Sequence, residues 1–179
     1  MNIITGYTGE PHVTPEQDAA AHRAKDVLAS CVFDDGECFE PYIESNTNVW
    51  VKDGICSIQG RYMCIDRGDH DEVQISSAAQ GKKRIDIICA AIKKNLDGTS
   101  ESWLEVFEGA ESAGTPVAPT IPETDLDGGD NEAYLPLVQV TIDGITITDA
   151  EMIGNMYELV IVDDVLEAEL TAILGDISH

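Results

Sequence analysis

The chain has 179 residues, and its 34 acidic and 10 basic side chains give a formal net charge of −24. This negative charge disfavours binding to nucleic acids and anionic membranes, because phosphate binding needs clustered Lys and Arg. Every basic residue stands at or before Lys94, and 19 acidic residues follow it. Either this acidic second half serves solubility or its carboxylates meet a basic surface on a neighbouring subunit.

Length and a hydrophobic fraction of 43% suit one globular domain with its own core. The first residues lack the basic and apolar regions of a signal peptide, and no apolar run approaches a membrane span. We therefore expect a protein made in a cytoplasm and not inserted in a membrane. The five cysteines include no C-x-x-C pair, which favours reduced, mostly buried thiols.

Residues 1–13 are predicted to form an extended arm, because Gly6, Gly9 and Pro11 disfavour a helix. The apolar or aromatic residues of this arm could dock on its own domain or on a neighbour. Those expected at an interface are Ile4, Tyr7, His12 and Val13.

A helix is predicted over residues 14–33. Thr14 is a candidate N-cap, Pro15 suits the first helical position, and Gln17 completes a capping box. An apolar face at helical spacing supports the helix, formed by Ala20, Ala24, Val27, Leu28 and Cys31.

From about Glu40 the hydrophobic period changes to two, which indicates strands. Asn48–Lys52 and Ile55–Gly60 flank Asp53-Gly54, a dipeptide typical of a tight hairpin turn. We expect Arg61–Ile65 to continue the second strand past a bulge, and Val73–Ser77 to form another strand.

Arg84–Lys94 is apolar on both faces, which predicts a central strand, and Ser102–Glu108 is its predicted return strand. Residues 109–132 are rich in Gly, Pro and Thr without any period. A loop of that length is uncommon inside a compact domain, so it is either an arm contacting a neighbour or a mobile surface loop.

A second hairpin is predicted where Tyr134–Ile142 and Ile145–Thr148 flank Asp143-Gly144. Residues 149–179 form an acidic segment, in which we expect a strand at Glu158–Val162 and then a short helix. The predicted fold is therefore mainly β with minor α. It has an antiparallel sandwich-like core over residues 40–148, an N-terminal arm and helix, and a short C-terminal helix.

Two groups of acidic residues are candidate metal sites. The acidic residues between Asp66 and Glu72 fit no ligand register and are expected to form a solvated turn. Asp125, Asp127 and Asp130 resemble the start of a calcium loop, but the later positions do not match, which leaves adventitious cation binding. No cofactor is expected. No local signature frames a cysteine or serine nucleophile, so the chain is expected not to be an enzyme.

The turn before the central strand carries three of the ten basic residues, Lys82, Lys83 and Arg84. It is either a solvated turn with gatekeeping charges or a docking point for a neighbour's acidic face.

Three stretches together resemble a known family. The opening Ile3–Thr14 with Gln17-Asp18, the turn Gly81–Asp86, and Pro116–Gly144 are similar to baseplate and receptor-binding-apparatus proteins of phages and prophages of Gram-positive bacteria. The resemblance covers roughly residues 1–18 and 80–145. Residues 19–45 and the chain after Thr148 do not match it.

The resemblance implies a structural virion component that connects the tail tip to the host-adhesion apparatus. Its expected partners are other baseplate proteins and copies of itself, and its location is the virion. A carbohydrate- or receptor-binding module is the alternative, with Trp50, Trp103 and Tyr134 as a stacking platform. A cell-wall hydrolase using paired carboxylates is a third hypothesis.

Overall fold

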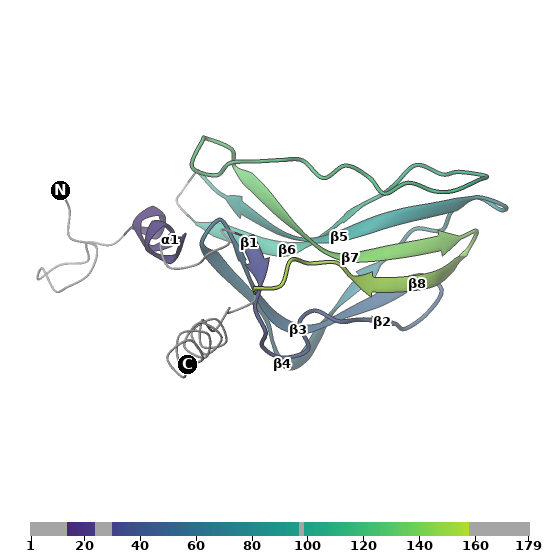
Figure 1. Ribbon diagram of the computed structural model, residues 1–179, viewed down its shortest axis with the longest axis horizontal. Helices are drawn as coiled ribbons and strands as arrows, with labels where there is room; N and C mark the ends of the chain where they lie inside the picture. The colour runs from purple at the N-terminus through teal and green to yellow at the C-terminus, as the bar shows by residue number, and fades with distance from the viewer. Residues whose placement is uncertain (1–13, 24–29, 97–98, 158–179) are drawn as a thin grey trace, which may run out of the picture.

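The computed structural model describes residues 14–23, 30–96 and 99–157. These residues form two four-stranded antiparallel sheets and one helix, so the chain is mainly β as predicted (Figure 1). None of the described helices is long and apolar enough to span a membrane.

Sheet A is built around the long strand β3. β3 (Asn48–Ile58) pairs along one edge with β4 (Arg61–Gln74). Its other edge is shared by β1 (Ser30–Val32) and β2 (Pro41–Ile43), each of which covers a different part of it.

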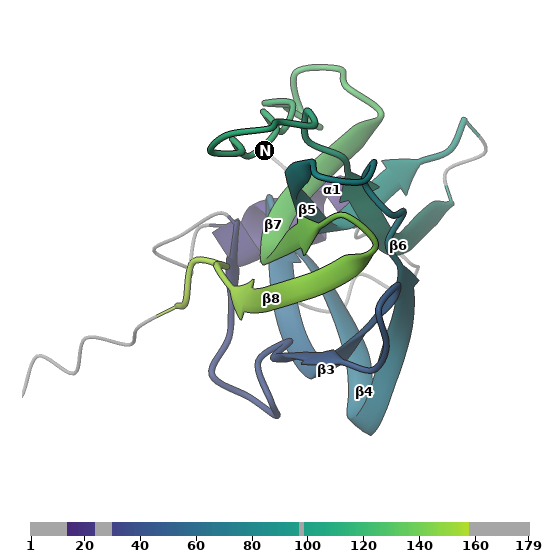
Figure 2. The same ribbon diagram turned by 90° about the vertical axis from the view of Figure 1, so that its right-hand side faces the viewer.

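Sheet B has the strand order β6-β5-β7-β8. The four strands are β5 (Lys83–Lys94), β6 (Ser100–Phe107), β7 (Glu132–Asp143) and β8 (Thr146–Met152). β5 lies between β6 and β7, which confirms the central strand predicted from its two apolar faces. The two sheets face each other, with β6 near β4 and β8 near β2 (Figure 2).

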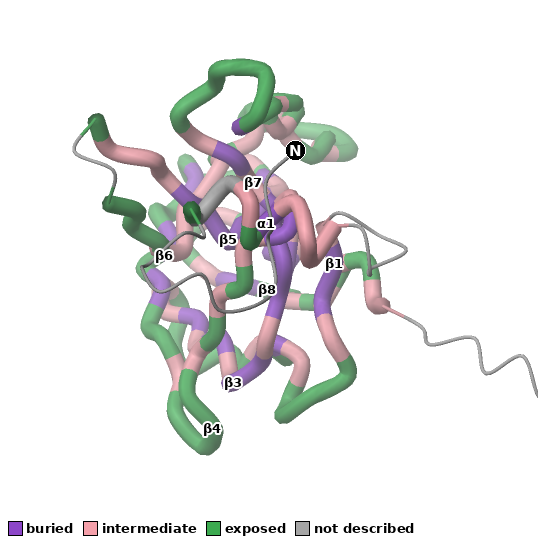
Figure 3. The backbone as a smooth tube through the Cα atoms, turned by 90° about the vertical axis from the view of Figure 1, so that its left-hand side faces the viewer, coloured by how far each residue is buried: buried purple, intermediate pink, exposed green. Residues whose placement is uncertain are grey.

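The core lies between the sheets and is mostly apolar. The buried polar residues of the described ranges are Asp53, Ser57, Arg84 and Asp86. On β3, Val49 and Val51 point inward, and on β5 the inward residues are Ile88, Ala90 and Ile92. Buried residues follow the strand interiors, whereas the far part of β4 is exposed (Figure 3). Burying one such aliphatic side chain contributes roughly 1.5–3 kcal/mol, so this alternation fixes which face of each strand is available to solvent.

The hairpin turn in sheet A is not at Asp53-Gly54, so that prediction is wrong. Ile58 pairs with Arg61, and the turn consists of Gln59 and Gly60, at φ +50° and +80°. Positive φ at both central residues is the type I′ pattern. Asp53-Gly54 instead forms an irregularity within β3, and Arg61–Ile65 and Val73-Gln74 belong to the single strand β4.

Asp53 shows why the local signal failed. Its buried carboxylate accepts hydrogen bonds from the backbone N–H groups of Glu37 and Gly68, each at 2.7 Å. These long-range bonds hold an Asp inside a strand, where its own propensity would place it in a turn. They also lower the pKa of Asp53, the bond from Gly68 being the largest cause.

The N-terminal helix is shorter than predicted. α1 covers Pro15–Arg23, and Ser30–Val32 is strand β1, so the prediction of helix as far as residue 33 is wrong. Its predicted start is confirmed, because Thr14 and Gln17 form the reciprocal bonds of a capping box at 3.3 and 3.1 Å. Cys31 contributes to β1 rather than to the helix's apolar face.

The second predicted hairpin is present, with its turn one residue later than predicted. Asp143 pairs with Thr146, so the two-residue turn between β7 and β8 is Gly144-Ile145, with Gly144 at φ +59°. The predicted strand at Glu158–Val162 and the C-terminal helix lie outside the described residues, as does the arm over residues 1–13.

The 109–132 region runs along the outer side of sheet B, above β5 and β7 (Figures 1 and 2). At its start Ser112 exchanges two backbone hydrogen bonds with Lys83, at 2.7 and 2.8 Å. At its end Leu126 is buried in the core, and the side chain of Gln59 bonds the backbone of Thr124 and Leu126. We call residues 113–124, between these anchors, the strap.

Candidate functional site

The predicted interface residues fall into two groups. Ile4, Tyr7, His12 and Val13 lie outside the described residues. The basic turn is described, and its three residues differ. Lys83 is exposed and pairs with Asp143 at 3.2 Å, and Lys82 is partly buried. Arg84 is buried, at 4% exposure, so its predicted role in docking a neighbour is corrected.

Arg84 is held by the fully buried Asp86. The guanidinium donates through Nε and Nη2 to the two carboxylate oxygens at 2.7 and 2.8 Å, a bidentate pair. Nη2 also donates to the carbonyl of Ser76, and Asp86 accepts the N–H of Gly109 at 3.0 Å. The pair therefore joins the chain before β5 to the segment after β6.

Two of the three stretches quoted for the resemblance, the basic turn and the end of the β7–β8 hairpin, meet at this end of sheet B. Gly144 donates its N–H to the carbonyl of Lys82 and accepts from the N–H of Ala78, both at 2.8 Å. Ser112 pairs with Lys83 from the other side. The basic turn, the start of the 109–132 region and the β7–β8 turn thus form one backbone-linked joint.

The acidic loop Asp125–Asp130 is held by hydrogen bonds between its own residues. Asp130 accepts the N–H of Asp125 at 2.7 Å, and Asp125 accepts the N–H of Asp127 at 2.9 Å. Asp127 faces two guanidinium groups, those of Arg23 at 2.5 Å and Arg61 at 3.4 Å. No group of three ligating side chains in the described part of the chain is arranged to hold a metal ion. This loop instead ties α1 to the β3–β4 turn.

The acidic run from Asp66 to Glu72 is solvated as predicted, but it is not a turn. It lies within β4, and its carboxylate residues are exposed. β4 remains paired with β3 at Asp71 and Glu72.

The described cysteines are free thiols, and Cys31, Cys56 and Cys89 are buried. Burial raises the pKa of both Cys56 and Cys89 to about 12. A thiol with such a pKa carries almost no thiolate at neutral pH, and the thiolate is the nucleophile. These two residues are therefore structural.

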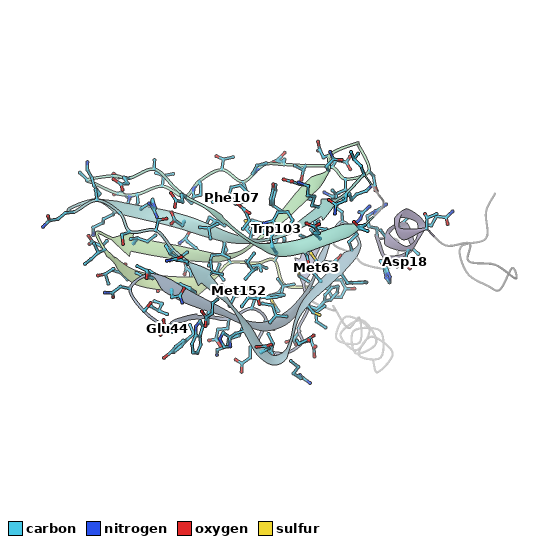
Figure 4. The ribbon with its side chains drawn as sticks, turned by 180° about the vertical axis from the view of Figure 1, so that it is seen from behind. Asp18, Glu44, Met63, Trp103, Phe107 and Met152 are labelled. Atoms are coloured by element: carbon cyan, nitrogen blue, oxygen red, sulfur yellow. The ribbon has the colours of Figure 1, made fainter. Side chains whose placement is uncertain are left out.

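The three aromatic residues predicted as one platform are on opposite sides of the sandwich. Trp50 lies between the core residues Val49 and Val51, so it points outward from sheet A. Trp103 and Tyr134 both pair with Ala91, on the outer face of sheet B. Figure 4 shows Trp103 with Phe107 along β6, whereas Glu44 lies on the sheet A side. The common platform is wrong.

An open cleft of about 860 Å³ lies beside the strap, lined among others by Tyr134, Lys93 and Pro122. Glu132 accepts hydrogen bonds from Tyr134 Oη at 2.7 Å and from Lys93 Nζ at 2.8 Å. The bond to Glu132 raises the pKa of Tyr134 to about 12. A general acid or base needs a pKa near the working pH, so this trio is not tuned for proton transfer at neutral pH.

A different aromatic cluster crosses the outer face of sheet A. Tyr42 on β2 lies opposite Trp50 on β3, with ring centroids 5.5 Å apart. His70 on β4 stacks on the other side of Trp50 at 4.2 Å. Glu44 and Glu72 lie beside these rings and are exposed. We call these five residues the sheet A platform.

Sequence reasoning missed this platform, although part of it was visible. Tyr42 and His70 were not grouped with Trp50, because 28 positions separate Tyr42 from His70. The pairing of β2 with β3 and the long β3–β4 hairpin bring them together, and only the registers of these strand pairs could have predicted it.

Comparisons with protein-family models, with curated proteins and with solved structures found no match to this chain.

Proposed function

We propose that this chain is a structural, non-catalytic subunit of a tailed-bacteriophage or prophage baseplate, connecting the tail tip to the adhesion apparatus through contacts with copies of itself and with other tail components. The observation that carries the proposal is the joint at the Arg84–Asp86 pair. There, residues of the motifs that resemble baseplate proteins serve to hold a rigid scaffold together.

The chemistry of the described side chains supports a non-catalytic role. Asp86 is committed to a buried guanidinium, and Glu132 to Lys93 and Tyr134. The thiols of Cys56 and Cys89 stay protonated. These groups hold the fold and are not tuned to react at neutral pH.

The finer architecture belongs to the same proposal. The arm over residues 1–13 and the 109–132 loop would supply inter-subunit contacts. The predicted C-terminal strand and helix belong to this finer architecture as well. α1 contacts Tyr62 through His22, and Tyr157 approaches the same cluster through Phe33, at 4.5 and 5.5 Å between ring centroids. The first described helix and the last described residue therefore lie at the same end of the sandwich.

The proposal is tested in the phage or prophage that encodes the chain. Tailed particles are purified, their proteins are identified by mass spectrometry, and the chain is located with gold-labelled antibody in electron micrographs. We expect the chain in intact particles with label at the distal end of the tail. Its absence from purified particles, or turnover of peptidoglycan by the isolated chain, would overturn the proposal.

A further inference from the structure

The outer face of sheet A presents aromatic rings to solvent in an order that strand pairing fixes. Tyr42 and Trp50 are directly opposite each other, and Glu72 is directly opposite Trp50 on the other side. Tyr42 is 53% exposed, and its neighbour Ile43 on the short edge strand β2 is 36% exposed. The platform lies at the end of β3 away from α1, which contacts the Gln59-Gly60 turn.

The carboxylates of the platform are unneutralised. Lys52 follows Trp50 by two positions on β3, and its ammonium group already pairs with Glu37 and Glu40, both at 3.0 Å. Within the described ranges, Glu44 and Glu72 form no ion pair with a basic side chain. Two exposed carboxylates therefore flank three rings on a face without a free local cation.

We propose that the sheet A platform docks a basic segment of a partner protein, with an arginine side chain stacking on the exposed ring of Tyr42 while Glu44 and Glu72 pair with its positive charges. This inference rests on the proposed function, since it names one contact surface of the assembly subunit. A guanidinium both stacks on aromatic faces and pairs with carboxylates, which matches the two kinds of group placed here.

A lysine-rich or purely hydroxylated ligand fits this surface less well. An ammonium is a compact, strongly hydrated charge that gains less from stacking, and a neutral glycan would leave both carboxylates without a partner. The Trp50 indole N–H is buried and makes no hydrogen bond within the described structure. This N–H gives a single resonance that reports on the centre of the platform.

The experiment uses the full chain with Trp103→Phe, which leaves Trp50 as the only tryptophan. Penta-arginine and penta-lysine are titrated in separate series while the Trp50 indole resonance and the binding isotherm are recorded. We expect penta-arginine to shift this resonance, to bind more tightly than penta-lysine, and to weaken with added salt. Tyr42→Ala and the double variant E44Q/E72Q should each weaken binding at least about fivefold.

The matched control is the double variant E101Q/E123Q. This control changes the net charge by the same amount at two exposed carboxylates, on β6 at the end of sheet B near α1 and on the strap. It should bind penta-arginine as the parent does. Equal loss in E44Q/E72Q and in this control, equal affinity for both peptides, or no effect of Tyr42→Ala would overturn the inference.

A glycan array with the same chain tests the alternative occupant of the platform, a carbohydrate. A bound glycan that is lost with Tyr42→Ala, without penta-arginine binding, would make the platform a carbohydrate site instead. Incorporation into tail particles separates failure of the platform inference from failure of the proposed function. If the chain is present in tail particles and E44Q/E72Q is incorporated normally, the platform inference fails while the proposed function stands.

Discussion

Replacing Asp86 by Asn tests whether the buried ion pair is the central joint of the scaffold. Asn keeps the size of the side chain and an oxygen that can accept the N–H of Gly109. It removes the charge that balances Arg84, whose side chain is only 5% exposed. Removing one partner of a buried pair leaves an uncompensated charge and typically costs about 3–5 kcal/mol.

Equilibrium unfolding in urea, followed by fluorescence and circular dichroism, measures this effect. With a slope of about 2 kcal/mol per molar, the midpoint of D86N should fall by roughly 1.5–2.5 M. The control is D143N, which removes the exposed partner of Lys83 and should cost less than about 1 kcal/mol. A midpoint for D86N that moves no further than that of D143N would refute the assigned role of the pair.

Three further perturbations test other parts of the fold. Gly60→Ala should destabilise the chain by more than about 1–2 kcal/mol, because an added Cβ would meet the carbonyl of Ala19 on α1 as well as adopt a left-handed φ. Gly68→Ala has a matching φ of +81° with open space around it, so only the conformational penalty should remain; equal unfolding midpoints would contradict the close packing of α1. Asp53 has a pKa below its ordinary value of 3.8, so its contribution to stability is present above about pH 4 and is lost as the pH falls through the lowered folded-state pKa. D53N should therefore show a shallower loss of unfolding free energy below pH 4, and an unchanged slope would disprove the assignment. Native labelling with iodoacetamide should modify the exposed Cys64 before Cys56 and Cys89, and rapid modification of either buried thiol, detected by peptide mass spectrometry, would contradict their burial.

The strand pattern of sheet B was predictable because its signals are local. β5 is apolar on both faces, and the Gly144 turn sits between two alternating segments. Such periodicity reflects burial on each face directly. The same reasoning correctly placed the start of α1, where the capping groups are only three residues apart.

Other features depend on partners that are distant in the sequence. The dipeptide Asp53-Gly54 by itself predicts a turn. Asp53 lies in a strand instead, because the backbone N–H groups of Glu37 and Gly68 donate to its carboxylate. Arg84 reads as a surface charge, although Asp86 stands two positions away on the same strand face. That face also carries the core residues Ile88, Ala90 and Ile92. The bonds to Ser76 and Gly109 that complete the buried pair could not be read from the spacing.

The two alternatives expected for the 109–132 region stay predictions. The structure adds that its ends are fixed on its own domain, by Ser112 on β5 and by Leu126 in the core. Periodicity gave no signal here because the anchoring groups are backbone atoms and a single apolar side chain.

The central claim is that the chain works as part of a tail assembly, and locating it in the particle tests this claim most directly. Electron cryomicroscopy of purified tailed particles should show density at the tip of the tail into which the two-sheet sandwich fits, in several symmetry-related copies. A reconstruction of the complete tail tip that leaves no density for this sandwich would contradict the account.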